Sequence, residues 1–118
     1  MSKRIVFDLD DTICYPNHNE KETFEKYGLA KPNERLIHHM RDLYDDGWFI
    51  IIHSSRRMVT HDGDIDKIIK DVGVITEEWL DEHGVPYDDL IFGKPYSSSY
   101  YVDDKAMNVR DFYKWAGE

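Results

Sequence analysis

Four short apolar runs occur along the chain, and each of them ends in a polar side chain. They are rich in β-branched and aromatic residues at consecutive positions. That pattern is typical of strands that are buried on both faces, as in parallel sheets. The sequence therefore predicts four strands, at 3–8, 48–52, 90–92 and 100–102.

The segments between these runs carry apolar residues three and four positions apart, which predicts amphipathic helices. The first helix is predicted to begin after Asn33, a good N-cap residue, and to end at the Asp-Asp-Gly sequence 45–47. The second is predicted over about 64–83, with Gly73 as a point where it could kink or divide. The third is predicted over 106–115.

Strands that alternate with helices predict β-α-β units, and therefore a mainly parallel sheet with helices on both faces. The length of 118 residues is that of one domain, so we predict a single domain over 1–118. Residues 13–31 fit neither pattern, and we interpret them as a flap that leaves the end of the first strand.

Composition and charge narrow the possible classes of protein. The single cysteine, Cys14, rules out a disulfide within the chain and fits a reducing compartment. The chain shows neither a signal-peptide pattern nor an apolar segment of membrane-spanning length, so we expect a cytoplasmic protein without a membrane partner. The net charge of −9 argues against broad binding to a nucleic acid backbone, but it is compatible with a local basic pocket.

The residues at the ends of the four predicted strands are those that can carry out chemistry. In open α/β sheets, ligands bind outside the carboxyl ends of the strands, so four distant segments would deliver these side chains to one crevice. The side chains are four carboxylates, a hydroxyl and an ammonium group: Asp8, Asp10, Ser54, Lys94, Asp103 and Asp104.

This set of side chains suits phosphoryl transfer. Asp8 and Asp10 are two residues apart, so an extended backbone would direct both toward the same side. With Asp103 or Asp104 they offer oxygen ligands for Mg²⁺, which would offset the repulsion between a carboxylate and a phosphate dianion.

The negative charge of the four carboxylates exceeds the positive charge of Mg²⁺ and Lys94, so a further cation is expected at the site. Arg56, two residues after Ser54, is the candidate, because arginine binds phosphate oxygens with two hydrogen bonds. The neighbouring Arg57 is expected to point to solvent.

Four motifs of the chain resemble those of the haloacid dehalogenase superfamily of phosphohydrolases, in the same order and over essentially the whole chain. The resemblance implies a Rossmann-like three-layer α/β/α sandwich with a mainly parallel central sheet. The intervals between the motifs leave no room for a separate cap domain, so the chain resembles the capless members, in which a neighbouring subunit can cover the open site. The motifs are Val6-Phe7-Asp8-Leu9-Asp10-Asp11-Thr12, Ile51-Ile52-His53-Ser54-Ser55-Arg56, Gly93-Lys94-Pro95 and Tyr101-Val102-Asp103-Asp104-Lys105-Ala106.

The resemblance also implies a role for each residue. Asp8 would attack phosphorus and form an aspartyl-phosphate, and Asp10 would protonate the leaving group and then deprotonate the hydrolytic water. Ser54 would donate a hydrogen bond to a phosphoryl oxygen, and Lys94 would stabilise Asp8 and the transferring group. Phosphate binding is expected from Leu9, Ser55, Arg56 and Lys94, and Mg²⁺ binding from Asp8, Asp10, Asp103 and Asp104.

We therefore expect a magnesium-dependent phosphatase that acts on a small phosphosugar or nucleotide. Candidates for substrate recognition are the flap and the segment 96–101, although ordinary loop packing explains both equally well. Two alternatives remain open: a polynucleotide end-phosphatase, and a catalytically weak binding or regulatory module on the same fold. A phospho-acceptor signalling domain is disfavoured, because the central run ends in His53-Ser54-Ser55, without a carboxylate.

Overall fold

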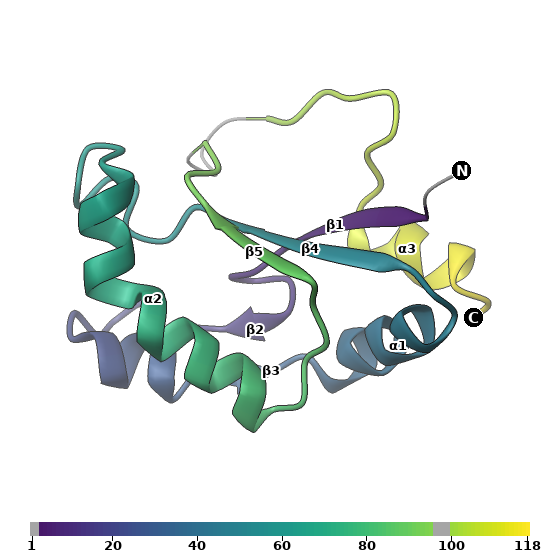
Figure 1. Cartoon of the computed structure of the whole chain (residues 1–118), viewed down its shortest axis with the longest axis horizontal. Coiled ribbons are helices and arrows are strands. Elements are labelled where there is room, and N and C mark those ends of the chain that lie inside the picture. The colour runs from purple at the N-terminus through teal and green to yellow at the C-terminus, as the bar shows by residue number, and fades with distance from the viewer. Residues whose placement is uncertain (1–2, 96–99) are drawn as a thin grey trace.

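A parallel sheet of three strands forms the centre of the structure and confirms three of the four predicted strands. The computed structural model describes residues 3–95 and 100–118. The strands lie side by side in the order β1-β4-β5, and β4 is the central strand (Figure 1). Their bounds are Arg4–Asp8 for β1, Phe49–Ser54 for β4 and Asp89–Phe92 for β5. All three carboxyl ends meet at one end of the sheet, as predicted.

Three α-helices follow the predicted pattern: α1 (Glu34–Asp45), α2 (Ile65–Glu82) and α3 (Val109–Trp115). Each begins at a polar residue whose side chain accepts a hydrogen bond from the backbone N–H three positions on. These caps are Asn33, Asp64 and Asn108, with distances of 3.2, 3.2 and 2.9 Å. The third helix starts later than predicted, because Asn108 provides its cap. The second runs through Gly73 without interruption.

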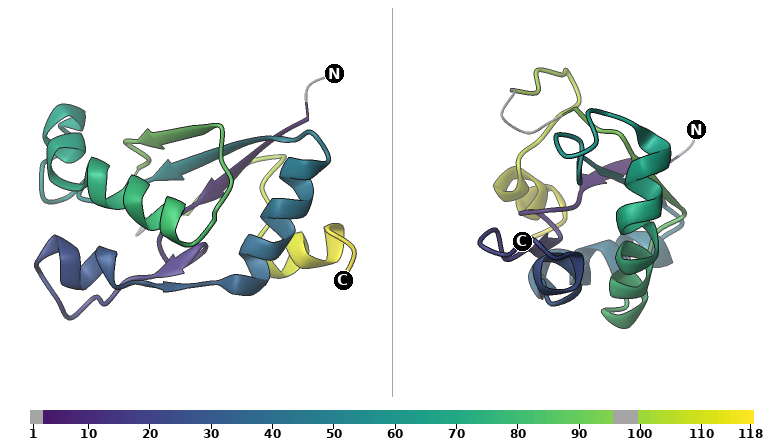
Figure 2. Two further views of the ribbon diagram at one scale, coloured as in Figure 1. Left: turned by 60° about the horizontal axis from the view of Figure 1, so that its bottom comes forward. Right: turned by 90° about the vertical axis from the view of Figure 1, so that its left-hand side faces the viewer.

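The flap contains more regular structure than a loop. Strands β2 (Cys14–Tyr15) and β3 (Lys31–Pro32) pair antiparallel, and the π-helix η1 (Phe24–Gly28) lies between them. In Figures 1 and 2, η1 lies beside α2. Tyr27 of η1 is buried there in a small cluster with Ile68 and Val72 of α2, so the flap is packed against the domain.

The main core lies on one face of the sheet. Figures 1 and 2 show the helices together on this side. The sheet contributes Phe7, Ile50 and Ile52, and the helices cover them with Leu36, Ile37, Met40, Trp79, Leu80 and Phe112. On the opposite face, Val6 and Ile91 remain 58% and 40% exposed. Because all three helices pack into one core, the second helical layer of the predicted sandwich is not formed by residues 3–95 and 100–118.

The predicted fourth strand is not formed. Residues 100–102 are irregular, and the side chains of Tyr100 and Val102 are 96% and 98% exposed. From residue 100 onward the chain runs toward α3, away from the helical side of the sheet (Figure 1). Residues with a high β-propensity form a strand only where a neighbouring edge accepts their hydrogen bonds, and among the described residues no strand pairs with 100–102.

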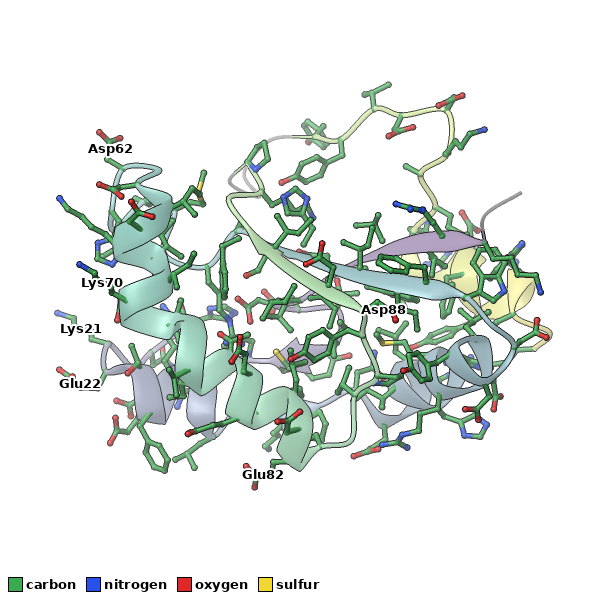
Figure 3. The ribbon with its side chains drawn as sticks, viewed as in Figure 1. Lys21, Glu22, Asp62, Lys70, Glu82 and Asp88 are labelled. Atoms are coloured by element: carbon green, nitrogen blue, oxygen red, sulfur yellow. The ribbon has the colours of Figure 1, made fainter. Side chains whose placement is uncertain are left out.

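The outer surface of the helical layer is strongly charged. Lys70 and Glu82 project outward from α2, and Lys21 and Glu22 project from the flap (Figure 3). Across the described ranges, the helices are too short or too polar to cross a membrane.

Candidate active site at the carboxyl end of the sheet

The chain turns tightly at the end of β1, and this turn holds two carboxylates in place. The backbone carbonyl of Leu9 accepts hydrogen bonds from the N–H groups of Thr12, Ile13 and Cys14, at 3.2, 2.8 and 3.3 Å. Asp11 has a φ of 63°, in the left-handed region that aspartate tolerates better than most residues. The side chain of Leu9 is fully buried. Leu9, predicted as a phosphate contact, thus anchors the turn through its side chain and its carbonyl.

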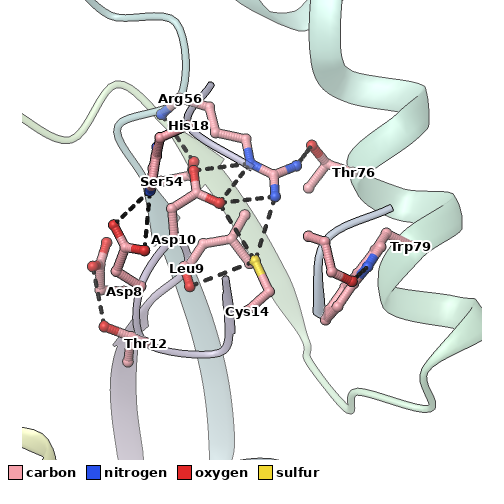
Figure 4. A network of polar contacts seen from close by, with 12 residues as sticks. Asp8, Leu9, Asp10, Thr12, Cys14, His18, Ser54, Arg56, Thr76 and Trp79 are labelled. Atoms are coloured by element: carbon pink, nitrogen blue, oxygen red, sulfur yellow. Dashed lines mark hydrogen bonds and ion pairs between the residues drawn. The ribbon is translucent and has the colours of Figure 1, made fainter. Parts of the chain in front are cut away.

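Asp8 is open to solvent on one side and paired with a cation. Its Oδ1 lies 3.1 Å from Nζ of Lys94, and its carboxylate is 31% exposed. Its Oδ2 accepts a hydrogen bond from the hydroxyl of Thr12 at 3.2 Å (Figure 4). The structure therefore brings Asp8 and Lys94 together, as the sequence predicted. The contact with Thr12 was missed, although a hydroxyl in the turn just after Asp8 was a usable signal.

Lys94 reaches Asp8 because β5 is held tightly against β4. The backbone carbonyl of Ser54 accepts hydrogen bonds from the N–H groups of Gly93 and Lys94, both at 3.1 Å. Gly93 has a φ of 102°, a conformation that favours glycine. The Nζ atom of Lys94 also lies 4.5 Å from the centre of the Tyr101 ring, within cation–π range. Tyr101 is thus near the site, and residues 96–99 of the same segment lie outside the described residues.

Asp10 forms an ion pair with Arg56 in the interior. Nε of Arg56 donates to both carboxylate oxygens of Asp10, at 3.1 and 3.0 Å, and Nη2 donates to one of them at 2.9 Å (Figure 4). Burial lowers the pKa of the Arg56 guanidinium, but the charge and hydrogen bonds of Asp10 offset this, and the pKa lies above its usual range.

The predictions for the two adjacent arginines were wrong. Arg56 is 2% exposed, and its guanidinium binds Asp10, so it is not an open phosphate contact. Arg57, expected to point to solvent, donates to the backbone carbonyl of Lys21 at 2.8 Å and lies 3.4 Å from the carboxylate of Asp71. Both side chains face inward, and only the tertiary packing of this loop brings Asp10 to Arg56 and brings Asp71 and the carbonyl of Lys21 to Arg57.

Ser54 is fully buried, because strand alternation places it on the helical face together with Ile52. Its Oγ accepts a hydrogen bond from the backbone N–H of Arg56 at 3.1 Å. In this arrangement a substrate has no access to the hydroxyl, and Ser54 instead positions Lys94 and Arg56. Ser55, also predicted to bind phosphate, accepts a hydrogen bond through its carbonyl from the N–H of Met58 at 3.2 Å.

His53 is the strand-end residue that lies beside Asp8 in the register of the sheet. Partial burial and the nearby ammonium group of Lys94 lower the pKa of the His53 imidazole, and the charge of Asp8 partly opposes them. No role for this histidine was predicted from the sequence. The register of the sheet would have placed His53 beside Asp8, because equivalent positions on neighbouring parallel strands face the same side.

Asp103 and Asp104 do not join the other carboxylates. Asp103 accepts a hydrogen bond from the backbone N–H of Lys105 at 2.9 Å, and this bond lowers the pKa of the Asp103 carboxyl. The side chain of Asp104 is 86% exposed. In the described part of the chain, no three carboxylate, imidazole or thiol groups are close enough to share a metal ion. The reason is the missing fourth strand, which was expected to carry this pair to the sheet end.

Among solved structures, the chain is similar to a structural-genomics target from Vibrio cholerae. The two are 31% identical and superpose with a TM-score of 0.77, over 97% of this chain and 96% of the other. The chain belongs to the same family as this Vibrio protein. The similarity extends over nearly all of both chains and therefore includes the flap and α3 of this chain.

A second solved structure shares the fold alone. It is the structure of a Pnkp1/Rnl/Hen1 complex, with a TM-score of 0.55 and 18% identity. The match covers 87% of this chain but 31% of the other, so this chain spans about a third of that protein's length. No protein-family model and no curated protein sequence matches the chain.

Proposed function

We propose that the chain is a capless phosphatase of the haloacid dehalogenase superfamily, with a Rossmann-like fold, and that it hydrolyses a phosphomonoester through an aspartyl-phosphate on Asp8. The observation that carries this proposal is the pair formed by Asp8 and Lys94 at the carboxyl end of the sheet, 3.1 Å apart and partly open to solvent. A carboxylate can attack phosphorus when a neighbouring cation shares the charge of the phosphoryl group. The order of the sequence motifs supports the superfamily.

Each residue then has a defined part in the reaction. A carboxylate oxygen of Asp8 forms a bond to phosphorus while the bond to the leaving oxygen breaks. Asp10 must be protonated when the substrate binds: it gives this proton to the leaving oxygen, and its carboxylate, the form that pairs with Arg56, then takes a proton from the water that attacks the aspartyl-phosphate. Lys94 stabilises the negative charge that develops on the phosphoryl oxygens. Ser54 supports the reaction indirectly, because its carbonyl holds the backbone of Lys94.

A divalent cation, Mg²⁺, is part of the proposal because of the charge at the site. Lys94 and Arg56 are each paired with one carboxylate, so a phosphate dianion meets a site whose described cations are already neutralised. The observed positions of Asp103 and Asp104 do not fit the predicted four-carboxylate metal site, and we therefore assign no catalytic step to the ion. The metal requirement is tested by turnover in EDTA and after Mg²⁺ is restored, where we expect loss and recovery of activity.

The decisive test compares wild-type protein with Asp8→Asn on a generic aryl phosphate in Mg²⁺. We expect turnover by the wild type and none by Asp8→Asn, with an unchanged circular dichroism spectrum. Asp11→Asn is the matched control: it removes a neighbouring carboxylate that contacts His18 at 3.1 Å, and turnover should persist. Full turnover by Asp8→Asn would show that the covalent mechanism is wrong.

The substrate is tested with a panel of phosphosugars, nucleotides and 3′-phosphorylated oligonucleotides. We expect the highest kcat/KM on a phosphosugar or a nucleotide. A clear preference for the oligonucleotides would instead favour a polynucleotide end-phosphatase. Absence of turnover on every substrate, with beryllium fluoride still bound at Asp8, would favour a regulatory module. Light scattering shows whether a second subunit is present to cover the open site.

A further inference from the structure

Arg56 is 2% exposed, and its guanidinium is held from several sides by buried groups. Besides its bonds to Asp10, it donates from Nη1 to the hydroxyl of Thr76 at 2.8 Å and from Nη2 to the sulfur of Cys14 at 3.5 Å. Its central carbon lies 4.2 Å from the centre of the Tyr27 ring. These contacts come from α2, β2 and η1, so three separate elements fix the direction of one side chain. Figure 4 shows the contacts with Thr76 and Cys14.

The residues around Arg56 are themselves immobilised by burial. Thr76 is 1% exposed, Cys14 is fully buried and Tyr27 is 5% exposed. The contact between Tyr27 and α2 also closes the flap against the domain. The position of Arg56 therefore follows from the packing of the flap on α2.

Asp10 is the group that this arrangement orients. Both of its oxygens accept hydrogen bonds from Arg56, and the fork of an arginine binds a carboxylate in one plane. The carboxylate is nevertheless 22% exposed, so one side of it faces outward. It lies two residues from Asp8 in a turn that the carbonyl of Leu9 holds in place. Asp10 thus has one defined direction relative to Asp8.

We infer that Arg56 is a positioning residue that aims Asp10 at the leaving group, and that Thr76 supports it from α2. This inference rests on the proposed function, in which Asp10 carries the proton. This role takes the place of the direct phosphate contact predicted for Arg56, because the burial of Arg56 prevents that contact. The flap and α2 thereby take part in catalysis without touching the substrate, because they hold the arginine that holds the acid.

The test is Arg56→Lys, which keeps a positive charge but cannot form the two-pronged bond to Asp10 and the bond to Thr76 together. We expect kcat to fall by about 10-fold to 100-fold, the range for a misplaced catalytic group, with KM changed by less than about twofold. Thr76→Val, a smaller change of similar shape, should produce a weaker loss of the same kind. Arg57→Lys is the matched control and should leave both constants unchanged.

Substrates with different leaving groups distinguish a misplaced Asp10 from a general loss of activity. An alkyl phosphate needs protonation of its leaving oxygen far more than a nitrophenyl phosphate does, because nitrophenolate leaves readily as an anion. Arg56→Lys and Asp10→Asn should therefore both slow the alkyl substrate more than the aryl substrate. In the Asp10→Asn background, Arg56→Lys should add less than about a twofold further loss, because residues that act as a unit are not additive.

The outcomes distinguish failure of the proposed function from failure of this inference alone. If the wild type shows no turnover that depends on Asp8, both the proposed function and this inference are overturned. If the wild type is active but Arg56→Lys raises KM with kcat unchanged, the arginine binds substrate and the inference alone fails. Equal losses on the alkyl and aryl substrates, or additive losses in the double variant, would overturn it as well. Should Arg56→Lys not fold, the same comparisons with Thr76→Val decide the question.

Discussion

Asn33 joins three parts of the molecule, and its replacement should reveal how strongly they depend on it. Its Oδ1 caps α1 by accepting a hydrogen bond from the N–H of Leu36 at 3.2 Å. Its Nδ2 donates to the carbonyl of Thr12 at 3.0 Å and to the hydroxyl of Tyr113 at 3.1 Å. One side chain thus connects the start of α1 to the turn that follows β1 and to α3.

The size of the effect follows from these three bonds. Loss of an N-cap costs about 1 kcal/mol, and loss of a hydrogen bond that leaves a part-buried partner unsatisfied costs about 1 kcal/mol or more. We therefore expect Asn33→Ala to lower the free energy of unfolding by about 3 kcal/mol. Asn33→Asp keeps the cap but removes both donors, so it should lose less than Asn33→Ala.

Urea unfolding followed by circular dichroism measures this loss, with the slope of the transition as a check on two-state behaviour. The matched control is Asn108→Ala, which removes an exposed cap whose oxygen, among the described residues, accepts from the N–H of Asp111 alone, at 2.9 Å. The control should lose about 1 kcal/mol or less. If Asn33→Ala were no more destabilising than Asn108→Ala, the bonds to the turn and to α3 would contribute nothing, and the reasoning would be refuted.

Four further predictions concern single residues. Burial and the nearby Asp10 raise the pKa of the Cys14 thiol, so a thiol reagent at pH 8 should modify it far more slowly in native protein than in urea; equal rates would contradict its burial. The pKa of His53 should lie below 6.5 by NMR titration and rise in Lys94→Met, and a lower value in that variant would contradict the stated cause. Because the unfolded state gains this proton first, stability should fall as pH drops below 6.5, and less so in His53→Gln. Gly93→Ala should destabilise by more than about 1 kcal/mol, because φ is 102° and the added Cβ would lie 2.6 Å from Cδ1 of Ile65; a neutral effect in thermal unfolding would refute this.

The helices and most of the strands were predictable because their signals are local. Asn33 and Asp64 act as caps through hydrogen bonds to their own helices, three residues away. Likewise, β4 and β5 are apolar runs of the length that a buried strand needs. Residues 100–102 carry the same local signal and form no strand, because a strand depends on a partner strand that can be distant in the sequence.

The juxtaposition of Asp8 and Lys94 was also predictable, because parallel strands place their carboxyl ends at one edge of the sheet. The sequence could not show which face of that sheet the helices would cover. Strand alternation places Ser54 and His53 on opposite faces of the sheet. Only the packing of all three helices on one face decides that Ser54 is the buried residue and that His53 lies beside Asp8 on the other face.

For the three strands that form, the sequence alone therefore determined the kinds of side chain at the carboxyl end of the sheet, since the ends of apolar runs can be read one segment at a time. The tertiary structure decided how these side chains pair. Arg56 binds Asp10 because Thr76 of α2 and Tyr27 of the flap surround its guanidinium, and these residues are far apart in the chain. A buried arginine is tolerated only where a carboxylate compensates its charge, and whether the two meet depends on the packing of the whole domain.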